Sequence, residues 1–426
     1  MTTALILLAG LAMIFINIPI AVALGAVSIV AMLVLQGTNS LLGFPLVLFE
    51  GATKFPLIAI PLFVLAGAIM NTGGISRRLI DFASALLGFV RGGLAMVNVG
   101  TSLFFAEISG SAVADVAALG SILIPEMKRK GYPAPFAAAI TSSSASLAII
   151  IPPSIPMILY AAMADTSVVQ LFVAGIVPGV VGGLLMMVLA WYFAVRYNFP
   201  VEQAFKLSRV WATFKAAGLA FLLPMIILGG IFGGFMTATE GAALAVLASL
   251  LISFRYGELK WSKLRAAMVD GGVQTAVVML LVASSALLGD FLTRAQLPQM
   301  LAAMIGDFTS NKYAVLALLN IFLLLIGMIL HSAAAIILTV PIVMPLVMMV
   351  GIDPVHFGMI VTLNLAIGQQ TPPVASVLMT ACSVAKANIW EVSKANVPFV
   401  ILLFVLLMLV TYVPIFPMGL VELFYR

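Results

Sequence analysis

Two stretches of the chain, TSSSASLAIIIPPSIP at residues 141–156 and LAIGQQTPPVAS at residues 365–376, decide how it folds. Each places two consecutive prolines inside an otherwise mostly apolar run. Proline has no backbone N–H and clashes with the preceding helical turn, and the residue before a proline is pushed out of the α region. The two stretches therefore predict two interrupted helices, near residues 135–160 and 355–385.

The two proline pairs, at residues 152–153 and 372–373, lie 220 residues apart, and much of the chain repeats at that offset. The residues that match include Gly10 and Gly230, Leu24 and Leu244, Gly51 and Gly271, Pro125 and Pro345, Gly131 and Gly351, and Val177-Pro178 and Val397-Pro398. Internal duplication with broken segments at matching positions is typical of secondary transporters. We predict two repeats, residues 1–215 and 216–426.

The composition places this duplicated chain in a membrane. Hydrophobic residues make up 63% of its 426 residues and charged residues 8%, whereas about 25% of the residues of a soluble domain are charged. A helical crossing needs roughly 20 apolar residues, so the apolar runs leave room for about a dozen membrane segments. These runs are continuous, as at residues 399–410, and lack the strict alternation of a transmembrane β-barrel. The sequence predicts an all-α polytopic membrane protein.

Other features exclude several classes of function. The first apolar run continues to Leu35 without a basic leading segment, which indicates a retained membrane helix rather than a signal peptide. Cys382 is the single cysteine, so no internal disulfide or cysteine-based metal cluster can form. The chain has two histidines, His331 and His356, which argues against a metal-centred enzyme. Its net charge of +5 comes without a basic and aromatic patch, so nucleic-acid binding has no support.

The loops that follow Pro125 and Pro345 differ in charge. The first reads EMKRKGYP, with three consecutive cations, and the second reads LVMMVGIDP, with none. Because Lys and Arg accumulate in cytoplasmic loops, the first loop is predicted to be cytoplasmic and the second external. Two further basic clusters, at residues 196–215 and 255–265, are each reached by two more crossings and return to the cytoplasmic side. The two repeats are therefore predicted to be inverted.

A hairpin-like segment precedes each broken helix. FFAEISGSAVADVAALGSILIPEM interrupts an apolar stretch with polar residues, which predicts a re-entrant hairpin near residues 101–125 with its tip at residues 109–111. The matching segment, LLIGMILHSAAAIILTVPIVMP, predicts a second hairpin near residues 322–346 that enters from the opposite face. His331 lies at the second tip, where we interpret it as a hydrogen-bonded residue rather than a proton carrier.

The breaks and the hairpin tips supply the groups that a sodium ion and an anion need. Freed backbone inside a membrane is tolerated only where it is buried in protein or lines a watery cavity. Its carbonyl oxygens, with the hydroxyls of Ser109 and Thr371, suit sodium, and helix N-termini attract an anion. We predict one midplane site for both ions. A plain kink is the alternative for either proline pair alone, and the serines at 142–144 and 146 are interpreted as packing residues that let helices approach closely.

Four ionisable residues lie in apolar stretches: Asp115, Glu240, Asp290 and Arg294. Burying a charge in a membrane is costly, so each is a functional candidate. Asp115 is predicted to contribute polarity to a substrate site or to fix the hairpin tip. Glu240 follows Thr237 by three residues, which is also the pattern of a capping box. Arg294 can pair with Asp290 at i, i+4 or offer its guanidinium to a substrate carboxylate, and both alternatives stay open.

Four motifs in order, SGSAVADVAALGSILIPEM, IIPPSIPMILY, TATEGAA and AIGQQTPPVAS, resemble the large membrane subunit (the M or DctM-type subunit) of tripartite ATP-independent periplasmic (TRAP) transporters. The resemblance covers essentially the whole chain. It implies a bacterial inner-membrane transporter that takes up an organic acid anion, such as a C4-dicarboxylate or sialic acid, with sodium ions. It also implies a small four-helix membrane subunit and a periplasmic substrate-binding protein as partners, and an elevator mechanism with a scaffold and a transport domain.

The resemblance also assigns site residues. It implies one sodium site formed by Ser109, Ala148, Ile151 and Pro153, and another formed by Gly327, Gly368, Thr371 and Val374. It implies a substrate site formed by Ser109, Ser111, Asp115, Ser154 and Arg294. Two motifs depart from the family: SLAIIIPP lacks the glycine-proline that often precedes the isoleucines, and TATEGAA replaces the more usual TPTEAAA. A carbonyl ligand survives the replacement of Gly by Ala, so the first departure affects local geometry, whereas the second touches only the scaffold.

The segments without hairpins or breaks, residues 5–35 and 45–70 and their second-half equivalents, are predicted to form a static scaffold. The moving unit is predicted to comprise residues of about 94–160 and 313–385. The predicted anchors at the membrane interface are Lys54, Trp191, Trp211 and the stretch KLSRVWATFK at residues 206–215.

Two other classes of protein are alternatives to this one. A stand-alone sodium- or proton-coupled anion symporter of the broader ion-transporter superfamily would share the repeats and hairpins but need no partner. An intramembrane enzyme would need a catalytic pair, and the sequence has neither a GxGD aspartate motif nor a serine–histidine arrangement on facing helices. A transporter is therefore the favoured class.

Overall fold

The computed structural model describes residues 9–10, 12–13, 16, 18–109, 111–201, 204–297, 299–300, 309 and 311–425, without the side chains of residues 35–36, 39, 41 and 105–109. In the first half the helices are α2 (Ile20–Gln36), η1 (Thr38–Gly43), α3 (Phe44–Ala52), η2 (Phe55–Ile58), α4 (Ala59–Thr72), α5 (Ile75–Leu87), α6 (Gly93–Ser109), α7 (Ala112–Arg129), α8 (Ala134–Ala148), α9 (Ile155–Met163) and α10 (Val168–Arg196). In the second half they are α11 (Leu207–Phe232), α12 (Ala238–Arg255), α13 (Trp261–Arg294), α15 (Lys312–Ile329), α16 (Ser332–Met349), α17 (Pro354–Gly368), α18 (Ser376–Ala385), α19 (Ile389–Tyr412) and α20 (Ile415–Tyr425). The described residues form one isolated β-bridge, between Arg91 and Val201, so the predicted all-α class is confirmed for them.

Eight helices in the described part of the chain are long and apolar enough to cross a membrane. They are Phe55–Thr72, α10, α11, α12, α13, α15, α16 and α19. Several shorter apolar helices accompany them, among them α17 and α18, which have 15 and 10 residues. At 1.5 Å per residue, neither α17 nor α18 alone crosses a hydrocarbon core of about 30 Å. The sequence predicts about a dozen membrane segments. Eight described helices are long enough to cross a membrane, and the other apolar helices are shorter.

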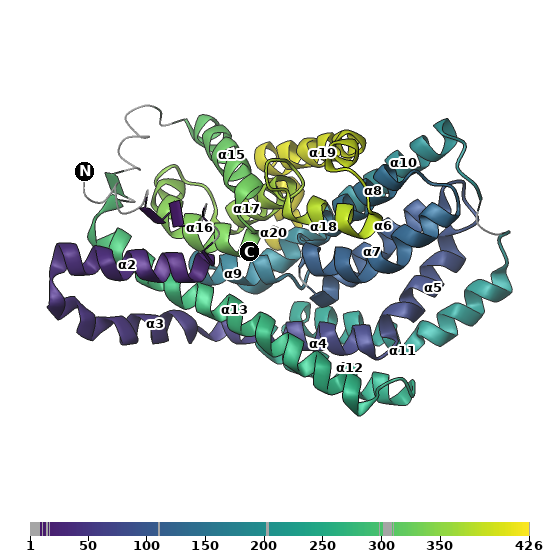
Figure 1. Cartoon of the computed structure of the whole chain (residues 1–426), viewed down its shortest axis with the longest axis horizontal. Helices are drawn as coiled ribbons and strands as arrows, with labels where there is room; N and C mark the ends of the chain where they lie inside the picture. Colours follow the sequence, from purple (N-terminus) through teal and green to yellow (C-terminus); the bar gives the residue numbers. More distant parts are fainter. Residues whose placement is uncertain are drawn as a thin grey trace.

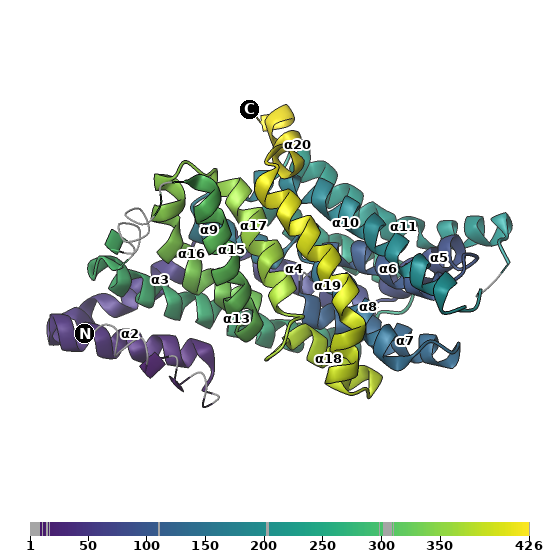
Figure 2. The ribbon, with the colours of Figure 1, turned by 90° about the horizontal axis from the view of Figure 1, so that it is seen from above.

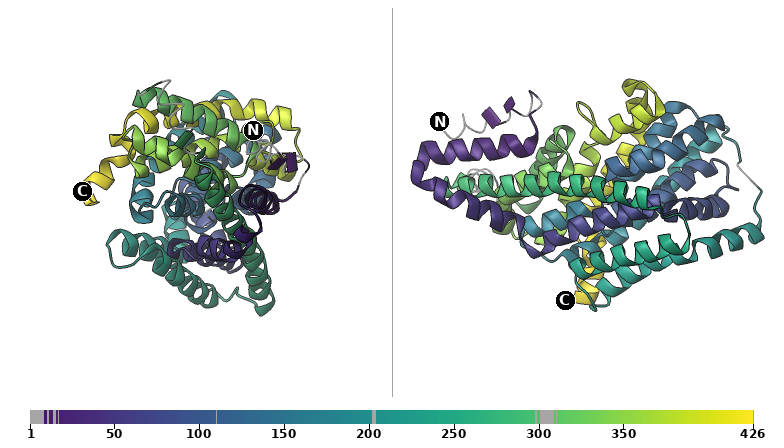
Figure 3. Two further views of the ribbon diagram at one scale, coloured as in Figure 1. Left: turned by 90° about the vertical axis from the view of Figure 1, so that its left-hand side faces the viewer. Right: turned by 60° about the horizontal axis from the view of Figure 1, so that its bottom comes forward.

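The helices gather into two groups (Figures 1 and 2). In the first group, α2, α3 and α4 pack against α13, α4 also packs against α12, and α11 packs against α5 and α12. In the second group, α6 to α9 and α15 to α18 pack against one another, with α10 and α19 on their flank. The 34-residue helix α13 runs beside α2 and α3 along one side of the molecule (Figure 3). Its length of about 51 Å, at 1.5 Å per residue, exceeds the bilayer core, so it cannot stand upright within it.

The second group repeats its own pattern. Helices α7 and α16 have bounds that differ by 220 residues at both ends, and so do α8 and α17. The contacts are reciprocal: α9 packs on α16 and α17, while its counterpart α18 packs on α7 and α8. Reciprocal contacts between equivalent elements are what a two-fold arrangement produces. The boundary between residues 215 and 216 and the inversion of the repeats in a membrane stay predictions.

The helix interruptions lie where the proline pairs predict them. Helix α8 ends at Ala148 and α9 begins at Ile155, so the first break spans residues 149–154. Helix α17 ends at Gly368 and α18 begins at Ser376, so the second break spans residues 369–375. The predicted hairpin tips coincide with helix boundaries, because α6 ends at Ser109 and α7 begins at Ala112, while α15 ends at Ile329 and α16 begins at Ser332.

Candidate functional site

A cavity of about 580 Å³ lies between the two groups of helices, at the hairpin tips. The first residues of α7, α9 and α16 line one side, and residues of α2, α4 and α13 line the other. Most of the lining is aliphatic. The polar side chains among the described lining residues are Ser111, Gln274, His331 and Ser332, and no Lys or Arg is among them. An anion in this cavity would therefore be held without a fixed positive side chain of the Lys or Arg type.

Three helices begin at this cavity. Ser111 caps the start of α7, Ile155 and Pro156 open α9, and Ser332 opens α16. The first backbone N–H groups of a helix have no partner within the helix, and the macrodipole places about half a positive charge at this end. Convergent helix N-termini form an anion site from backbone alone. The cavity can hold the charged end of an organic acid at these termini and its apolar part against the aliphatic walls.

The first hairpin tip positions two of the predicted substrate residues. Ser111 Oγ accepts a hydrogen bond from the backbone N–H of Ala114 at 3.5 Å, which is the usual geometry of an N-cap. Asp115 lies in the first turn of α7, is 2% exposed and is not among the residues that line the cavity. A carboxylate there stabilises the positive end of α7, which supports a role in fixing the tip. The side chain of Ser109 and all of Gly110 lie outside the described residues.

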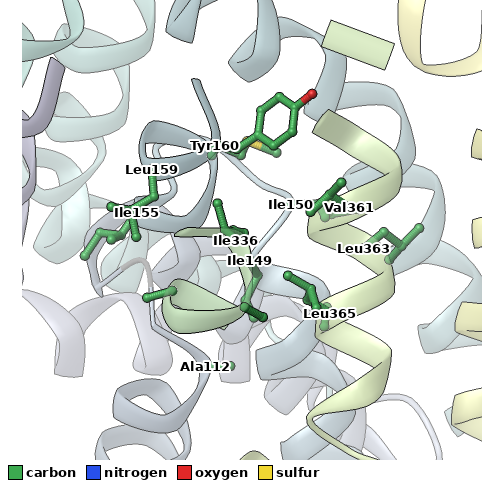
Figure 4. Close-up of a cluster of buried hydrophobic side chains, with 14 of the residues drawn as sticks. Ala112, Ile149, Ile150, Ile155, Leu159, Tyr160, Ile336, Val361, Leu363 and Leu365 are labelled. Carbon is green, nitrogen blue, oxygen red and sulfur yellow. The ribbon is translucent and has the colours of Figure 1, made fainter. Parts of the chain in front are cut away.

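The first break is enclosed by apolar side chains. Figure 4 shows Ile149 and Ile150 between the helices that carry the labelled residues Ile155, Leu159 and Tyr160 of α9 and Val361 and Leu365 of α17. The chain leaves α8 through short-range hydrogen bonds, the last of which joins Ile151 N–H to Ala148 O at 3.1 Å. Pro153 follows Pro152 through a cis peptide bond, and the buried Ser154 caps α9 by accepting from Met157 N–H at 3.5 Å. The carbonyl of Ala148 keeps a second lone pair, so it fits the role of a sodium ligand.

The second break brings together all four residues of the other predicted sodium site. Gly327 of α15 and Gly368 of α17 approach so closely that a Cβ on Gly368 would lie 2.6 Å from Gly327 Cα. Thr371 N–H donates to Gly368 O at 2.9 Å, and its hydroxyl donates to Ile367 O at 3.0 Å. Val374 N–H donates to Met328 O at 3.2 Å, which ties the break to the end of α15. The Thr371 hydroxyl and the Gly368 carbonyl both keep lone pairs, so this donor set also fits a sodium ion.

The remaining charged candidates lie away from the cavity. Arg294 donates to Asp290 at 2.8 Å in an exposed i, i+4 ion pair. It lies 13 residues beyond Leu281, the last residue of α13 that lines the cavity, and this is about 20 Å along a helix. Of the two alternatives for Arg294, the geometry therefore supports the ion pair with Asp290 rather than contact with a substrate carboxylate. Glu240 forms the predicted capping box with Thr237, which is confirmed.

Sequence reasoning missed a set of buried polar side chains between the helices. Ser143 of α8 lies 2.7 Å from Gln370 Oε1 and 2.6 Å from Asn396 Oδ1, and Asn396 Nδ2 donates to Gln370 Oε1 at 3.0 Å. Smaller groups link α6 to α8 and α15 to α17; they are Asn98 with Thr141 and Ser144, and Asn320 with Asn364. The signal was available, because Asn and Gln are rare and costly in apolar runs. The same signal would have found Gln274 in the cavity.

No group of three or more His, Cys, Asp or Glu side chains that could hold a metal ion occurs within the described residues. The fold, with its broken helices and its cavity between two helix groups, defines a membrane transporter. It is similar over 98% of this chain to the crystal structure of the YdaH transporter of Alcanivorax borkumensis, with 99% of that chain covered, a TM-score of 0.67 and 16% identity. That likeness concerns the fold alone.

The sequence model of the family described as tripartite ATP-independent periplasmic transporter, DctM component, matches residues 7–416, and the chain belongs to this family. A C4-dicarboxylate TRAP transporter large permease protein DctM of Pseudomonas aeruginosa is 39% identical, with 90% of each chain covered. The isethionate TRAP transporter permease protein DctMQ of Oleidesulfovibrio alaskensis is 38% identical over 95% of this chain, which spans 64% of that longer protein. The sialic acid permease SiaT of Haemophilus influenzae is 36% identical, with 85% of this chain and 59% of that protein covered. The resemblance read from the motifs is confirmed, and the chain is a transporter component rather than an enzyme.

Proposed function

We propose that this chain carries an organic acid anion across the bacterial inner membrane together with sodium ions. The observation that carries the proposal is the cavity at the hairpin tips, where the N-termini of α7, α9 and α16 converge among aliphatic walls. Helix N-termini suit a carboxylate or sulfonate group, and the walls suit the organic body. Relatives named for C4-dicarboxylate, isethionate and sialic acid share an acidic group, which supports this substrate class.

Sodium is a cotransported substrate in this proposal, with one site at each break. The site at the second break comprises Gly327, Gly368, Thr371 and Val374, whose backbones meet at the crossing of α15 and α17. The site at the first break comprises the Ala148, Ile151 and Pro153 carbonyls with Ser109. Sodium bound at both breaks would hold the chain that begins α9 and α18, and through α9 it would order the anion site. This shared framework gives a physical reason for coupling the two substrates.

The proposed motion is an elevator. The group of α6 to α9 and α15 to α18 holds both breaks and both tips, and it faces the group of α2, α3, α4 and α13 across the cavity. Broken helices that pack on one another in a reciprocal pattern are suited to move as one body. The substrate would then travel with the first group while the second group stays in place.

The family membership supports two partners for this chain, a small membrane subunit and a periplasmic binding protein that delivers the anion. The name DctMQ of one longer relative supports the first of them. The orientation is supported by the basic clusters, because Arg129 and Lys130 lie around one pocket with Arg209, at one end of the molecule. A shared end is what cytoplasmic loops require. Uptake by this chain alone would instead favour a stand-alone symporter.

The test is uptake of a radiolabelled anion into proteoliposomes that contain the chain and both partners. We expect uptake to require an inward sodium gradient, and we expect Thr371→Ala to raise the sodium concentration for half-maximal uptake roughly tenfold, as loss of one ligand costs about 1.4 kcal/mol. Ser109→Ala should act in the same direction. Thr53→Ala is the matched control, because the Thr53 hydroxyl also donates to a carbonyl four residues earlier but lies on the exposed end of α3. Equal uptake in potassium without sodium would contradict the proposal.

A further inference from the structure

A second pocket, of about 620 Å³, lies far from the hairpin tips, among α5, α6, α7 and the start of α11. Along α7 it is reached at Ile122, 11 residues and about 16 Å from Ser111 at the tip. The pocket touches both groups of helices, because α5 and α11 belong to one and α6 and α7 to the other. It shares no lining residue with the cavity at the hairpin tips, so it is a separate pocket.

The charged lining of this pocket has both signs. Asp81, Glu126, Arg129, Lys130 and Arg209 surround it. Arg129 pairs with Glu126 one turn earlier on α7. Among the described residues, no hydrogen bond or ion pair joins the side chain of Asp81 or of Arg209 to a partner. A carboxylate and a guanidinium that face the same space are complementary to a ligand that carries both a cation and an anion.

The surroundings of the pocket are those of a membrane–water boundary. Trp211 and Phe214 of α11 are exposed and stack at 5.7 Å between ring centroids, and Lys215 lies over the Trp211 ring. Exposed aromatic rings with neighbouring cations mark the headgroup level of a bilayer. Ile122, which lines the pocket, is 54% exposed. A ligand with a polar head and an apolar tail could extend from the pocket over this residue.

We propose that this pocket binds the headgroup of a zwitterionic phospholipid of the phosphoethanolamine type. Arg209 receives the phosphodiester, for which a guanidinium has the matching geometry. Asp81 receives the primary ammonium. The acyl chains lie over Ile122 in the bilayer. Asp81, which is not used by the Arg129–Glu126 pair, disfavours a headgroup that brings no cation of its own, because like charges repel at short range.

The test is native mass spectrometry of the full chain purified in detergent, with phosphatidylethanolamine, phosphatidylglycerol and inorganic phosphate added separately. We expect phosphatidylethanolamine to bind most tightly and to survive competition by millimolar phosphate. Arg209→Gln should weaken phosphatidylethanolamine and phosphatidylglycerol alike by roughly fivefold, through loss of a charge-assisted hydrogen bond. Asp81→Asn should weaken phosphatidylethanolamine and leave phosphatidylglycerol unchanged or tighter.

The matched controls are Arg265→Gln and Asp270→Asn, which remove the same charges from α13 outside the pocket. Thermal unfolding without added lipid identifies any variant that is unfolded. If Arg209→Gln or Asp81→Asn is unfolded, Arg209→Lys or Asp81→Glu is tested instead. Equal affinities for Arg209→Gln and Arg265→Gln would overturn the site. Tighter binding of phosphatidylglycerol that is indifferent to Asp81→Asn would overturn the zwitterionic headgroup, and displacement of the lipid by phosphate would identify a site for the free ion instead.

Discussion

The first break, residues 149–154, is enclosed by apolar side chains, whereas the second, residues 369–375, is enclosed by amides and by backbone from a neighbouring helix. In the first break every residue except Ile151 is buried, and the isoleucines fill the space between α9 and α17 (Figure 4). In the second break Gln369 and Gln370 are buried, while Pro373 and Val374 are exposed. The duplicated proline pairs determine where the helices end. The side chains around the two breaks differ, with apolar residues at the first and amides at the second.

Each break also meets a glycine of a different helix. A Cβ on Gly175 of α10 would clash with the carbonyl oxygen of Ile150 in the first break. A Cβ on Gly368, which ends α17 at the second break, would clash with the backbone of Gly327 on α15. The second break is thus joined to its own hairpin, and the first to a flanking helix. We infer that the second break responds directly to movement of a hairpin arm.

The largest effect is expected for Gly368→Ala. The new Cβ would lie 2.5 and 2.6 Å from two backbone atoms of Gly327, so α15 and α17 must separate. We expect uptake to be lost, and the free energy of unfolding to fall by about 1–3 kcal/mol, as for other overpacked cores. Thermal unfolding in detergent and proteoliposome uptake measure the two effects. Gly218→Ala on α11 is the control, because its Cβ meets nothing within 4 Å. Similar behaviour of both variants would remove the proposed importance of the crossing.

A smaller effect is expected from the polar side chains that link α8 and α19 to the second break. Ser143→Ala leaves Asn396 Oδ1 without the Ser143 hydroxyl, so we expect a loss of about 1–3 kcal/mol in unfolding free energy. Ser146→Ala on the same helix is the matched control, since the buried Ser146 hydroxyl has no hydrogen-bond partner among the described residues. Removing an unpaired buried hydroxyl should be neutral or stabilising. If Ser146→Ala destabilises as much as Ser143→Ala, side-chain packing rather than hydrogen bonding holds α8 to the second break.

The smallest effects are expected at the residues that start the helices after the breaks, and they should have opposite signs. Ser154→Ala removes the side-chain cap of α9 and should cost about 1 kcal/mol. Ala375, before α18, has φ +48° and no side-chain cap, so Ala375→Gly relieves left-handed strain and should stabilise by about 0.5–1 kcal/mol. Both changes are measured by the midpoint of thermal unfolding. Destabilisation by Ala375→Gly would show that the buried methyl group of Ala375 contributes more than the left-handed strain costs.

Local chemistry explains which parts of this fold the sequence could predict. A proline pair interrupts a helix whatever surrounds it, so both breaks were predictable, and the Asp290–Arg294 pair and the Thr237–Glu240 capping box are equally local. The approach of Gly327 to Gly368 depends on how two distant helices cross, which no short pattern specifies. Gln274 stands out as a polar residue in an apolar stretch, whereas its place in the cavity depends on how α13 packs against the other helices. The buried Ser143 was interpreted as a packing residue, and it also bonds to Gln370 because α8 lies against the second break.

The most direct measurement of the central claim is a reversible crosslink across the cavity at the hairpin tips. Val277 of α13 and Ala334 of α16 line this cavity from opposite helix groups. In a Cys382→Ala background, Val277→Cys and Ala334→Cys would be joined by a bis-methanethiosulfonate reagent and reconstituted with both partners. The account predicts that crosslinking stops uptake, that reduction with dithiothreitol restores it, and that the same reagent on either single cysteine, which occupies the cavity without tethering the helix groups, slows uptake less than the tether does. Uptake at an unchanged rate by the fully crosslinked protein would contradict movement of one helix group past the other.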